Sequence, residues 1–131
     1  MEHDILARAL SAINNAEKKG KAIVIVRPVS KLLEAIFKKL QEEKYISGFK
    51  FIDDKKGGIF EIKLAGTINK IGAIKPRFSV NLSNYEKFEK RYLPAKDFGR
   101  IIVSTPKGIF THIEAKKKNL GGVLLAYVYW N

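Results

Sequence analysis

The stretch AIVIVRPVSKLLEAIFKKL, residues 22–40, predicts a strand followed directly by a helix. Its first six residues are rich in β-branched side chains and stop at Pro28, which is typical of a buried strand. Ser30 is a good N-cap, and apolar residues then recur with the spacing of one helix face. These residues are Leu32, Leu33, Ile36, Phe37 and Leu40. A strand leading into an amphipathic helix indicates helices packed on a sheet.

The residues before this unit predict a first helix of the same design. Asp4 is suited to cap it, and the helix is expected to end near Lys19 and Gly20. Its apolar face consists of Ile5, Leu6, Ala9, Leu10 and Ile13. Two similar helices therefore flank the strand, and we expect both to pack on one face of a small sheet.

The residues after the unit predict a β-hairpin. Apolar and polar residues alternate over 49–52 and again over 60–64, on either side of the polar segment DDKKGG. Together these elements predict a helix-strand-helix-strand-strand lobe over residues 1–65. The aromatic residues Phe37, Phe51, Phe60 and Phe78 fall on apolar faces and are expected in the core.

The second half of the chain predicts a mostly β lobe over residues 66–131. Glycines and a proline interrupt residues 65–82, which we interpret as a connector followed by a strand near 77–82. The expected elements after it are a short helix in YEKFEKRY, a loop in PAKDFG, a strand in RIIVS, a short helix in THIEAKKKN and a closing strand in VLLAYVYW. The fold class expected for the whole chain is α+β, in two small lobes.

Composition restricts the class of partner. The 131 residues carry a formal net charge of +12, so the surface attracts polyanions, which include nucleic acid, anionic membranes and acidic proteins. No apolar run approaches the roughly 20 residues that cross a bilayer, and the start of the chain lacks the features of a secretory signal. The absence of cysteine fits a reducing compartment. We expect an intracellular protein.

No pattern in the sequence predicts catalysis or a cofactor. Only His3 and His112 are available as histidine metal ligands, and they lie at opposite ends of the chain. Ser104, His112 and Asp97 are the residue types of a catalytic triad, but no nucleophile motif surrounds the serine. No glycine pattern matches a phosphate loop. The sequence therefore predicts binding, with no catalytic residue, metal ion, cofactor or small-molecule substrate.

The segment STPKGIFTHIEAKKKNLGG, residues 104–122, is the strongest candidate for binding. Thr111 and Glu114 match a capping box, and hydroxyls, a proline bend and a lysine precede it. A helix N-terminus favours anions, so contact with phosphate or ribose is expected here. The lysines at 116–118 either complement the helix dipole or bind the partner. Gly121 and Gly122 either end the helix or let another backbone approach.

A second group of aromatic residues leaves two alternatives open. Tyr85, Phe88 and Tyr92 alternate with charged residues in YEKFEKRYLP. They are placed either to stack on nucleic-acid bases or to pack a short helix against the second lobe.

Several stretches together resemble the universal small-ribosomal-subunit protein eight family, in its archaeal and eukaryotic form. They are DILARALSAINNAEKKGK, RPVSKLLEAI, FKFIDD, INKIGAIKPRFSV, RYLPAKDFGRIIVSTPKGI and GGVLLAYVYW, in that order over residues 4–130. The resemblance implies a cytoplasmic component of the ribosome with two lobes. They would clamp an irregular helix in the central domain of small-subunit ribosomal RNA, beside neighbouring ribosomal proteins and without a membrane partner.

The resemblance also implies which residues touch the RNA. The loop that enters the RNA minor groove corresponds to Ser104, Thr105, Lys107, Gly108 and Thr111, with Gly121 and Gly122 on the same face, and further contacts come from Asp4, Pro28, Ser30 and Lys31. Four positions depart from the family pattern: Pro106 replaces a third hydroxyl residue of the bacterial branch, Phe110 a methionine, His112 a frequent aspartate, and Lys44 a glycine. The added charge of Lys44 is expected to extend the RNA contact.

Three other functions remain open. The family resemblance also allows a free regulator, which would recognise a messenger RNA that imitates the ribosomal site. An RNA-processing enzyme would need an acid/base pair or a metal cluster. An adaptor would use the positive charge on a membrane surface or an acidic protein.

Overall fold

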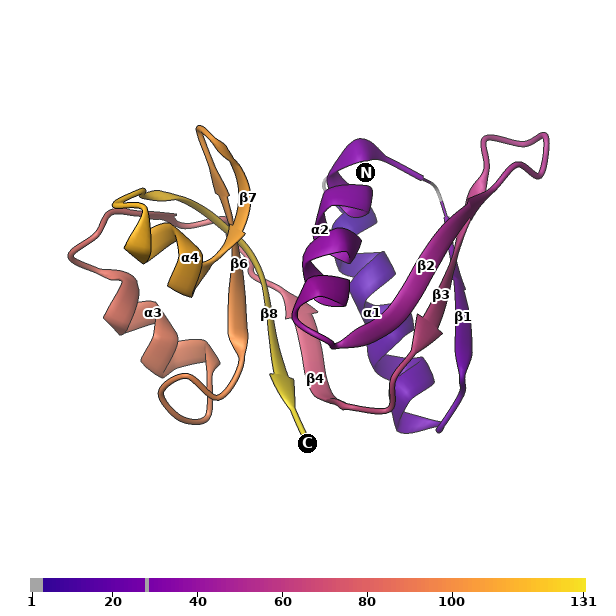
Figure 1. The fold of residues 1–131 in the computed structure, drawn as a ribbon, viewed down its shortest axis with the longest axis horizontal. Coiled ribbons are helices and arrows are strands. Elements are labelled where there is room, and N and C mark those ends of the chain that lie inside the picture. The colour runs from indigo at the N-terminus through magenta and orange to yellow at the C-terminus, as the bar shows by residue number, and fades with distance from the viewer. Residues whose placement is uncertain (1–3, 28) are drawn as a thin grey trace.

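The computed structural model describes residues 4–27 and 29–131, without the side chain of Asp4. Two lobes lie side by side, with α-helices in both and the last strand running along their junction (Figure 1). The predicted α+β class is confirmed. Two predicted contacts, Pro28 and the side chain of Asp4, lie outside the described residues.

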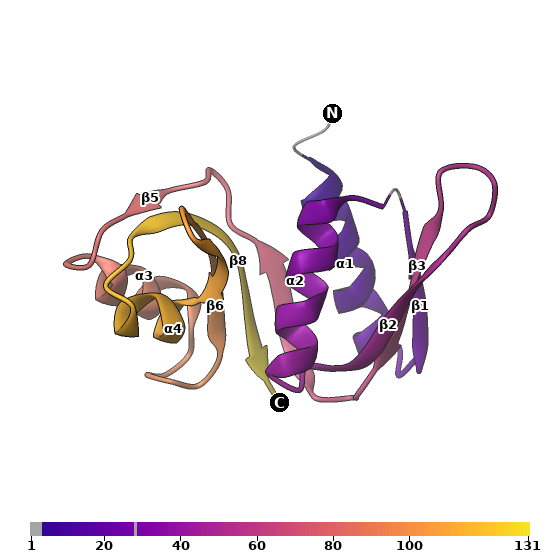
Figure 2. The same ribbon diagram turned by 45° about the horizontal axis from the view of Figure 1, so that its top comes forward.

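The N-terminal lobe is a three-stranded antiparallel sheet with both helices on one face (Figures 1 and 2). Its elements are α1 (Asp4–Lys18), β1 (Ile23–Val26), α2 (Lys31–Glu42), β2 (Ile46–Ile52) and β3 (Ile59–Leu64). The strand order is β1-β3-β2, so the hairpin is paired along its length and β1 is added to the β3 side. The predicted sequence of elements is confirmed.

The predicted apolar faces of the two helices form the core of this lobe. Leu10 and Ile13 of α1 and Leu33 and Ile36 of α2 are at most 1% exposed. Burying side chains of this size stabilises a fold by about 1.5–3 kcal/mol each. The helical spacing of apolar residues in the sequence therefore identified the side chains that pack the two helices against the sheet.

Two residue environments differ from the prediction. β1 is an edge strand whose Ile23 and Ile25 are 45% and 43% exposed, because the helices cover only one face of the sheet. β-branched composition alone could not distinguish this strand from a buried one. Phe51, expected in the core, is 56% exposed beside the start of α2.

The C-terminal lobe is built on a five-stranded antiparallel sheet, with two short helices on the face away from the N-terminal lobe (Figure 1). Its elements are β4 (Ile68–Ala73), β5 (Ser79–Val80), α3 (Tyr85–Tyr92), β6 (Arg100–Thr105), β7 (Gly108–Thr111), α4 (His112–Lys117) and β8 (Gly122–Trp130). The strand order is β4-β8-β6-β7, and β5 also pairs with β8. Both short helices, the loop after α3, β6 and β8 match the prediction.

Two strands of this lobe were not predicted. Residues 68–73, expected as part of a connector, form the full strand β4, while the strand expected near 77–82 is only the two-residue β5. β4 forms because Ile68 and Ile71 are buried against the N-terminal lobe while its backbone pairs with β8. β7 forms because the chain turns back on β6 in a tight hairpin. Strand β4 depends on a partner that is distant in the sequence, and β7 depends on a turn that reverses the chain. Local residue patterns reveal neither.

The two lobes share a continuous apolar core. Leu125 and Val128 of β8 are buried in the same cluster as residues of α1 and α2. At the junction, Tyr45 stacks on Trp130 with ring centroids 4.6 Å apart, and Arg100 donates a 2.7 Å hydrogen bond to Glu43. Strand β3 ends at Leu64 and β4 begins at Ile68, so the predicted division near residue 65 falls between strands but remains a prediction.

Candidate nucleic-acid interface

The residues predicted to bind RNA come from two parts of the chain that lie along one edge of the molecule. The tip of the β6–β7 hairpin and the start of α2 both point to this edge, and the start of α1 lies beside α2 (Figures 1 and 2). Lys107 and Gly108 are exposed at the hairpin, and Lys31 is exposed at α2. We call this the hairpin edge.

The hairpin tip is a tight turn fixed by Thr105. Thr105 pairs with Gly108 across the two strands, which leaves Pro106 and Lys107 as the turn. The Thr105 hydroxyl donates to the Gly108 carbonyl at 2.9 Å and accepts from the Lys107 amide at 3.1 Å. Gly108 has φ +130°, which disfavours any side chain. Thr105 therefore shapes the turn, and Lys107 is the side chain presented at its tip.

Gly121 and Gly122 allow the strands beneath the hairpin to approach closely. A Cβ on Gly122 would overlap the carbonyl oxygen of Ser104, and one on Gly121 would lie 2.5 Å from the carbonyl oxygen of Val80. The sequence suggested that these glycines let another backbone approach. The backbone that approaches belongs to neighbouring strands of this same protein. Helix α4 ends at Lys117 with Lys118 as its C-cap, and the left-handed position that follows is taken by Asn119, which has φ +58°.

Ser104 lies two residues before Pro106, the first residue of the turn, and is partly exposed. It pairs with Ile109 in β7 and with Val123 in β8. Its neighbour Gly122 brings the two backbones together at this point. Ser104 is therefore held on a three-strand platform rather than on a loop.

The predicted capping box at α4 is confirmed. The Thr111 hydroxyl accepts from the Glu114 amide at 3.2 Å, and the Thr111 amide donates to the Glu114 carboxylate at 2.9 Å. Thr111 is only 1% exposed. Strand β7 separates this helix start from the hairpin tip, and Glu114 already supplies its negative charge. Thr111 therefore positions the hairpin, and the helix start is not open to a phosphate.

Glu114 also connects α4 to α2. Its carboxylate lies 3.0 Å from the Lys39 ammonium. Burial raises the pKa of Glu114, but hydrogen bonds from the Thr111 amide and from Lys39 outweigh it, so the pKa is below its ordinary value. Phe110, one of the departures from the family pattern, lies between Lys39 and Lys118, at 5.4 and 5.2 Å from its ring centroid. These contacts join the start of α4 and the end of β7 to the last turn of α2.

His112 is a core residue. It is fully buried, and its Nδ1 accepts a 3.0 Å hydrogen bond from the Ile101 amide. Burial lowers its pKa to about 4, so the ring is neutral at pH 7 with its proton on Nε2. Because the Nδ1 lone pair is engaged by backbone, His112 is not arranged as a base for Ser104.

The helix aromatics pack inside the protein. Tyr85 is fully buried and donates a 2.8 Å hydrogen bond to the Leu120 carbonyl, and Phe88 is 5% exposed. Tyr92 stacks on Tyr127 with centroids 5.4 Å apart. Of the two alternatives left by the sequence, packing is confirmed for this group.

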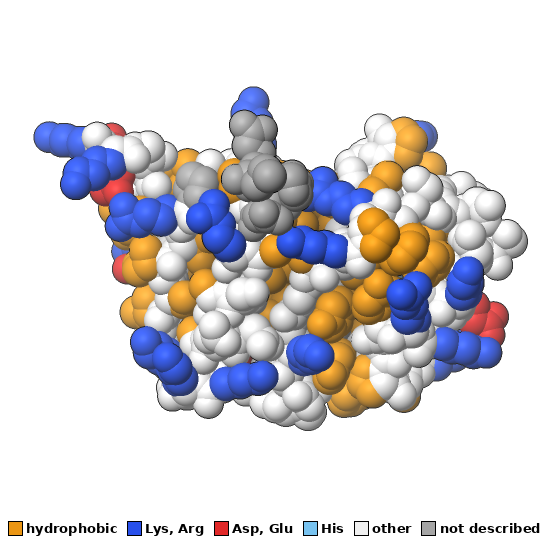
Figure 3. Space-filling view, turned by 180° about the vertical axis from the view of Figure 1, so that it is seen from behind, with side chains coloured by type: hydrophobic (Ala, Val, Ile, Leu, Met, Phe, Trp, Pro, Cys, Tyr) orange, Lys and Arg blue, Asp and Glu red, His pale blue; other side chains and the backbone are white. Residues whose placement is uncertain are grey.

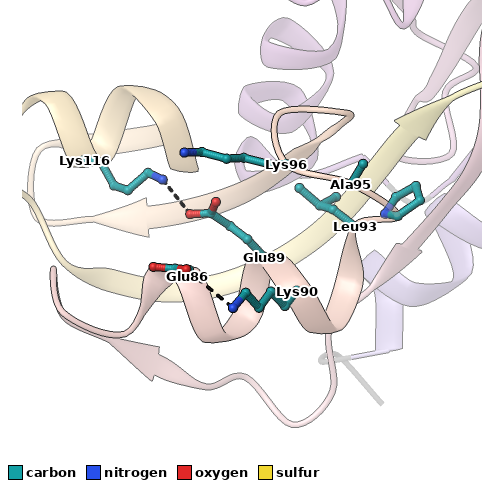
Figure 4. Close-up of a pocket in the computed structure, with 8 residues that line it drawn as sticks. Glu86, Glu89, Lys90, Leu93, Ala95, Lys96 and Lys116 are labelled. Carbon is teal, nitrogen blue, oxygen red and sulfur yellow. Dashed lines mark hydrogen bonds and ion pairs between the residues drawn. The ribbon is translucent and has the colours of Figure 1, made fainter.

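A cavity of about 330 Å³ lies between α3 and α4, on the C-terminal lobe (Figure 4). Glu89 of α3 points to Lys116 of α4 and lies 2.6 Å from it, while Lys90 lies 3.5 Å from Glu86. The two lysines and the two glutamates therefore form ion pairs with each other across the cavity lining. The described residues also contain no cluster of three or more His, Asp or Glu side chains placed to hold a metal ion.

The surface charge extends over both lobes. On the face shown in Figure 3, Lys and Arg side chains lie along both the upper and the lower parts of the molecule, over both lobes, whereas the acidic side chains in view lie near its two ends. Such a distribution favours an extended polyanion over a point anion. Among the described residues, no helix is long and apolar enough to cross a membrane.

Comparison with known protein families is consistent with this geometry. The family model for ribosomal protein S8 matches residues 4–129, which is nearly the whole chain. Proteins of this family are structural, non-enzymatic components of the small ribosomal subunit, where they bind ribosomal RNA and act in translation. The chain therefore belongs to the ribosomal protein S8 family.

Proposed function

We propose that this protein binds the central domain of small-subunit ribosomal RNA with the hairpin edge and thereby supports subunit assembly and translation in the cytoplasm. The observation that carries the proposal is the meeting of the β6–β7 hairpin and the start of α2 on one edge. Lys107 and Lys31 provide cations there, and Ser30 and Ser104 provide hydroxyls. The stretches quoted above favour the archaeal and eukaryotic form of the family.

The contacts are divided between phosphate neutralisation and groove recognition. Lys31 and Lys107 approach phosphates, which contributes affinity that falls with salt. The Ser104 hydroxyl both donates and accepts, which suits the ribose 2′-hydroxyls and base edges of a shallow RNA minor groove. Thr105, Gly108, Thr111, Gly121 and Gly122 hold this arrangement. The proposed binding residues therefore have two roles, contact and positioning.

Binding of the full chain to the isolated central-domain RNA helix, compared with a scrambled duplex of equal length across a salt series, tests the proposal. Ser104→Ala should weaken binding to the native helix by about 1 kcal/mol without changing the salt slope. Lys107→Ala should weaken binding to both RNAs and reduce the slope by about one. Equal affinities of the wild type for both RNAs at every salt concentration would refute groove recognition.

Two matched variants control for general effects. Ser47→Ala changes an exposed serine on β2, and Lys63→Ala changes an exposed lysine on β3, both away from the hairpin. Each should bind like the wild type. Cosedimentation of the protein with small subunits separates the ribosomal role from that of a free messenger-RNA regulator, which would stay in the unbound fraction.

A further inference from the structure

An open groove lies where β2 passes the start of α2. It has a volume of about 270 Å³. The residues lining it are Val29, Ser30, Lys31, Glu34, Phe51 and Phe60. Phe60 is buried at the base, whereas Phe51 is 56% exposed. The groove thus presents one aromatic ring to solvent beside two residues of the hairpin edge.

The Phe51 ring is uncovered because the helix layer ends beside it. Phe51 pairs with Phe60 on the helix-facing side of the sheet, and Phe37 of α2 covers Phe60 and Phe49 at centroid distances of 5.4 and 5.7 Å. Helix α2 begins only at Lys31, at the rim of the groove. The exposed face of this ring therefore contributes little to the core of the lobe and is available to a partner.

The ring is nevertheless held in a defined position. Its edge-to-face contact with Phe60 has a centroid distance of 6.4 Å. Gly58 has φ +90°, and a Cβ there would lie 2.6 Å from the Phe51 Cζ atom. The turn that carries Gly58 is fixed by Asp54, which accepts from the amides of Lys56 and Gly58 at 2.9 Å each. A glycine thus makes room for a pre-positioned aromatic surface.

The charges around the groove favour an anionic occupant. Lys31 is exposed at its rim, and Lys55 and Lys56 are exposed in the adjoining turn. The Arg27 side chain is 60% exposed, although it pairs with Asp54 at 3.1 Å. The one carboxylate in the lining is Glu34, which only accepts hydrogen bonds and suits the amino group of a base. An exposed ring bordered by cations is the arrangement that binds single-stranded nucleic acid.

We propose that this groove binds one unpaired nucleotide of ribosomal RNA, with its base stacked on Phe51 and its phosphate near Lys31. The inference rests on the proposed function and adds a single-stranded contact to the duplex contact of the hairpin. Ser30 caps α2 by accepting from the Leu33 amide at 3.1 Å, which leaves its hydroxyl proton free to donate to the nucleotide. The two contacts lie on the same side of the molecule (Figure 2).

Binding of Phe51→Leu to the complete small-subunit rRNA transcript is the first test. Leucine keeps an apolar side chain but loses the stacking face, so the affinity should fall by about 5- to 150-fold, the range for one stacked base. The salt slope should stay the same because no cation is removed. Phe51→Tyr should retain the affinity. Phe98→Leu is the control, because Phe98 is 39% exposed on the loop before β6 and lies against Trp130.

Ultraviolet irradiation of the wild-type complex, followed by mass spectrometry, should identify a nucleotide adduct on Phe51. Unchanged affinity of Phe51→Leu together with the absence of this adduct would overturn the inference. If Lys107→Ala still weakens binding in that case, the hairpin interface stands without the groove. Unchanged RNA affinity with poorer incorporation into small subunits would assign the groove to a protein partner and would also overturn the inference.

Discussion

Lys44 adopts a backbone conformation that favours glycine. It has φ +67° and follows Glu43, the C-cap of α2; the Lys44 amide donates to the Gln41 carbonyl and the Tyr45 amide to the Leu40 carbonyl. These two bonds form a Schellman motif, in which the residue in the left-handed conformation is usually glycine. The left-handed conformation at this position explains why the family pattern has glycine where this chain has Lys44.

Replacing Lys44 with glycine should therefore stabilise the protein. Relief of the left-handed strain contributes about 1 kcal/mol after allowance for the greater freedom of glycine in the unfolded chain. Urea denaturation should show a higher midpoint with an unchanged slope. Lys38→Gly, an exposed position in the middle of α2, is the control and should lower stability by about 1 kcal/mol. A lower midpoint for Lys44→Gly would contradict the strain argument.

His112 should make stability depend on pH between about 4 and 6.5. Its folded pKa is lowered to about 4 by burial from the ordinary 6.5, so the unfolded chain binds a proton first as the pH falls. This stabilising contribution is complete above pH 6.5, is lost as the pH falls, and amounts to about 3 kcal/mol in full. Urea midpoints measured from pH 7.5 to 4.5 test this.

His112→Gln supplies the comparison for the pH series. Glutamine can still accept from the Ile101 amide but does not titrate. Its stability at pH 7.5 gives the cost of the substitution itself, and its pH dependence below 6.5 should be flatter than that of the wild type. Parallel curves for the two proteins would assign the acid sensitivity to other groups.

Helices were predictable where their ends are signalled by adjacent residues. Ser30 and Thr111 cap α2 and α4 as expected because each hydroxyl bonds an amide only three residues ahead. The end of α4 was not predictable from its glycines, because Asn119 takes the left-handed position instead. Strand β4 was missed because its partner β8 lies far away in the sequence, and β7 was missed because it depends on a tight turn that reverses the chain onto β6.

The candidate site was predictable by residue type more than by role. Lys107 is exposed at the hairpin tip and Ser30 is partly exposed at the start of α2, and both remain proposed RNA contacts. Thr105 and Thr111 use their hydroxyls within the chain, and this depends on three-dimensional bonds that no spacing reveals. Phe51 was assigned to the core because strand alternation gives its face but not where the covering helix begins.

At the scale of strands, Gly122, the first residue of β8, should not tolerate a larger side chain. A methyl group at this position would overlap the Ser104 carbonyl, so Gly122→Ala must push β8 away from β6. We expect a loss of about 1–3 kcal/mol in the free energy of unfolding and weaker RNA binding, because the platform under the hairpin shifts. Urea denaturation and the RNA-binding assay measure the two effects.

Gly48→Ala is the matched control for Gly122→Ala. Gly48 lies in β2, has no positive φ, and no atom lies within 4 Å of the Cβ that would be added. Its stability should stay the same or rise by about 0.5 kcal/mol, since alanine has less freedom in the unfolded chain. Equal stability of the two variants would mean that β8 moves aside without strain.

For the whole molecule, the class of fold and the class of partner followed from patterns that are averaged over many residues. Amphipathic spacing predicted the helix layer, and the net charge of +12 predicted a polyanion. The junction between the lobes did not follow, because it joins residues such as Tyr45 and Trp130 that lie far apart in the sequence. The sequence therefore predicted two lobes but not how tightly they are coupled.

The shared core predicts that the two lobes unfold together. Trp130 is the only tryptophan, and it lies on the last strand of the C-terminal lobe against Tyr45, so its fluorescence reports on the junction. Circular dichroism at 222 nm reports mainly on α1 and α2, the longest helices, which lie in the N-terminal lobe. Because Leu125 and Val128 pack in the same cluster as these helices, both probes should give one urea midpoint.

Weakening the junction should keep the two transitions together while lowering both. Trp130→Leu removes the stacked ring from Tyr45 and leaves an apolar side chain, so we expect a loss of about 1–2 kcal/mol in the free energy of unfolding. In this variant the midpoint is followed by circular dichroism and by tyrosine fluorescence. Two separate midpoints in either protein would show that the lobes are independent domains, and that the buried residues of β8 contribute less to the N-terminal core than their packing indicates.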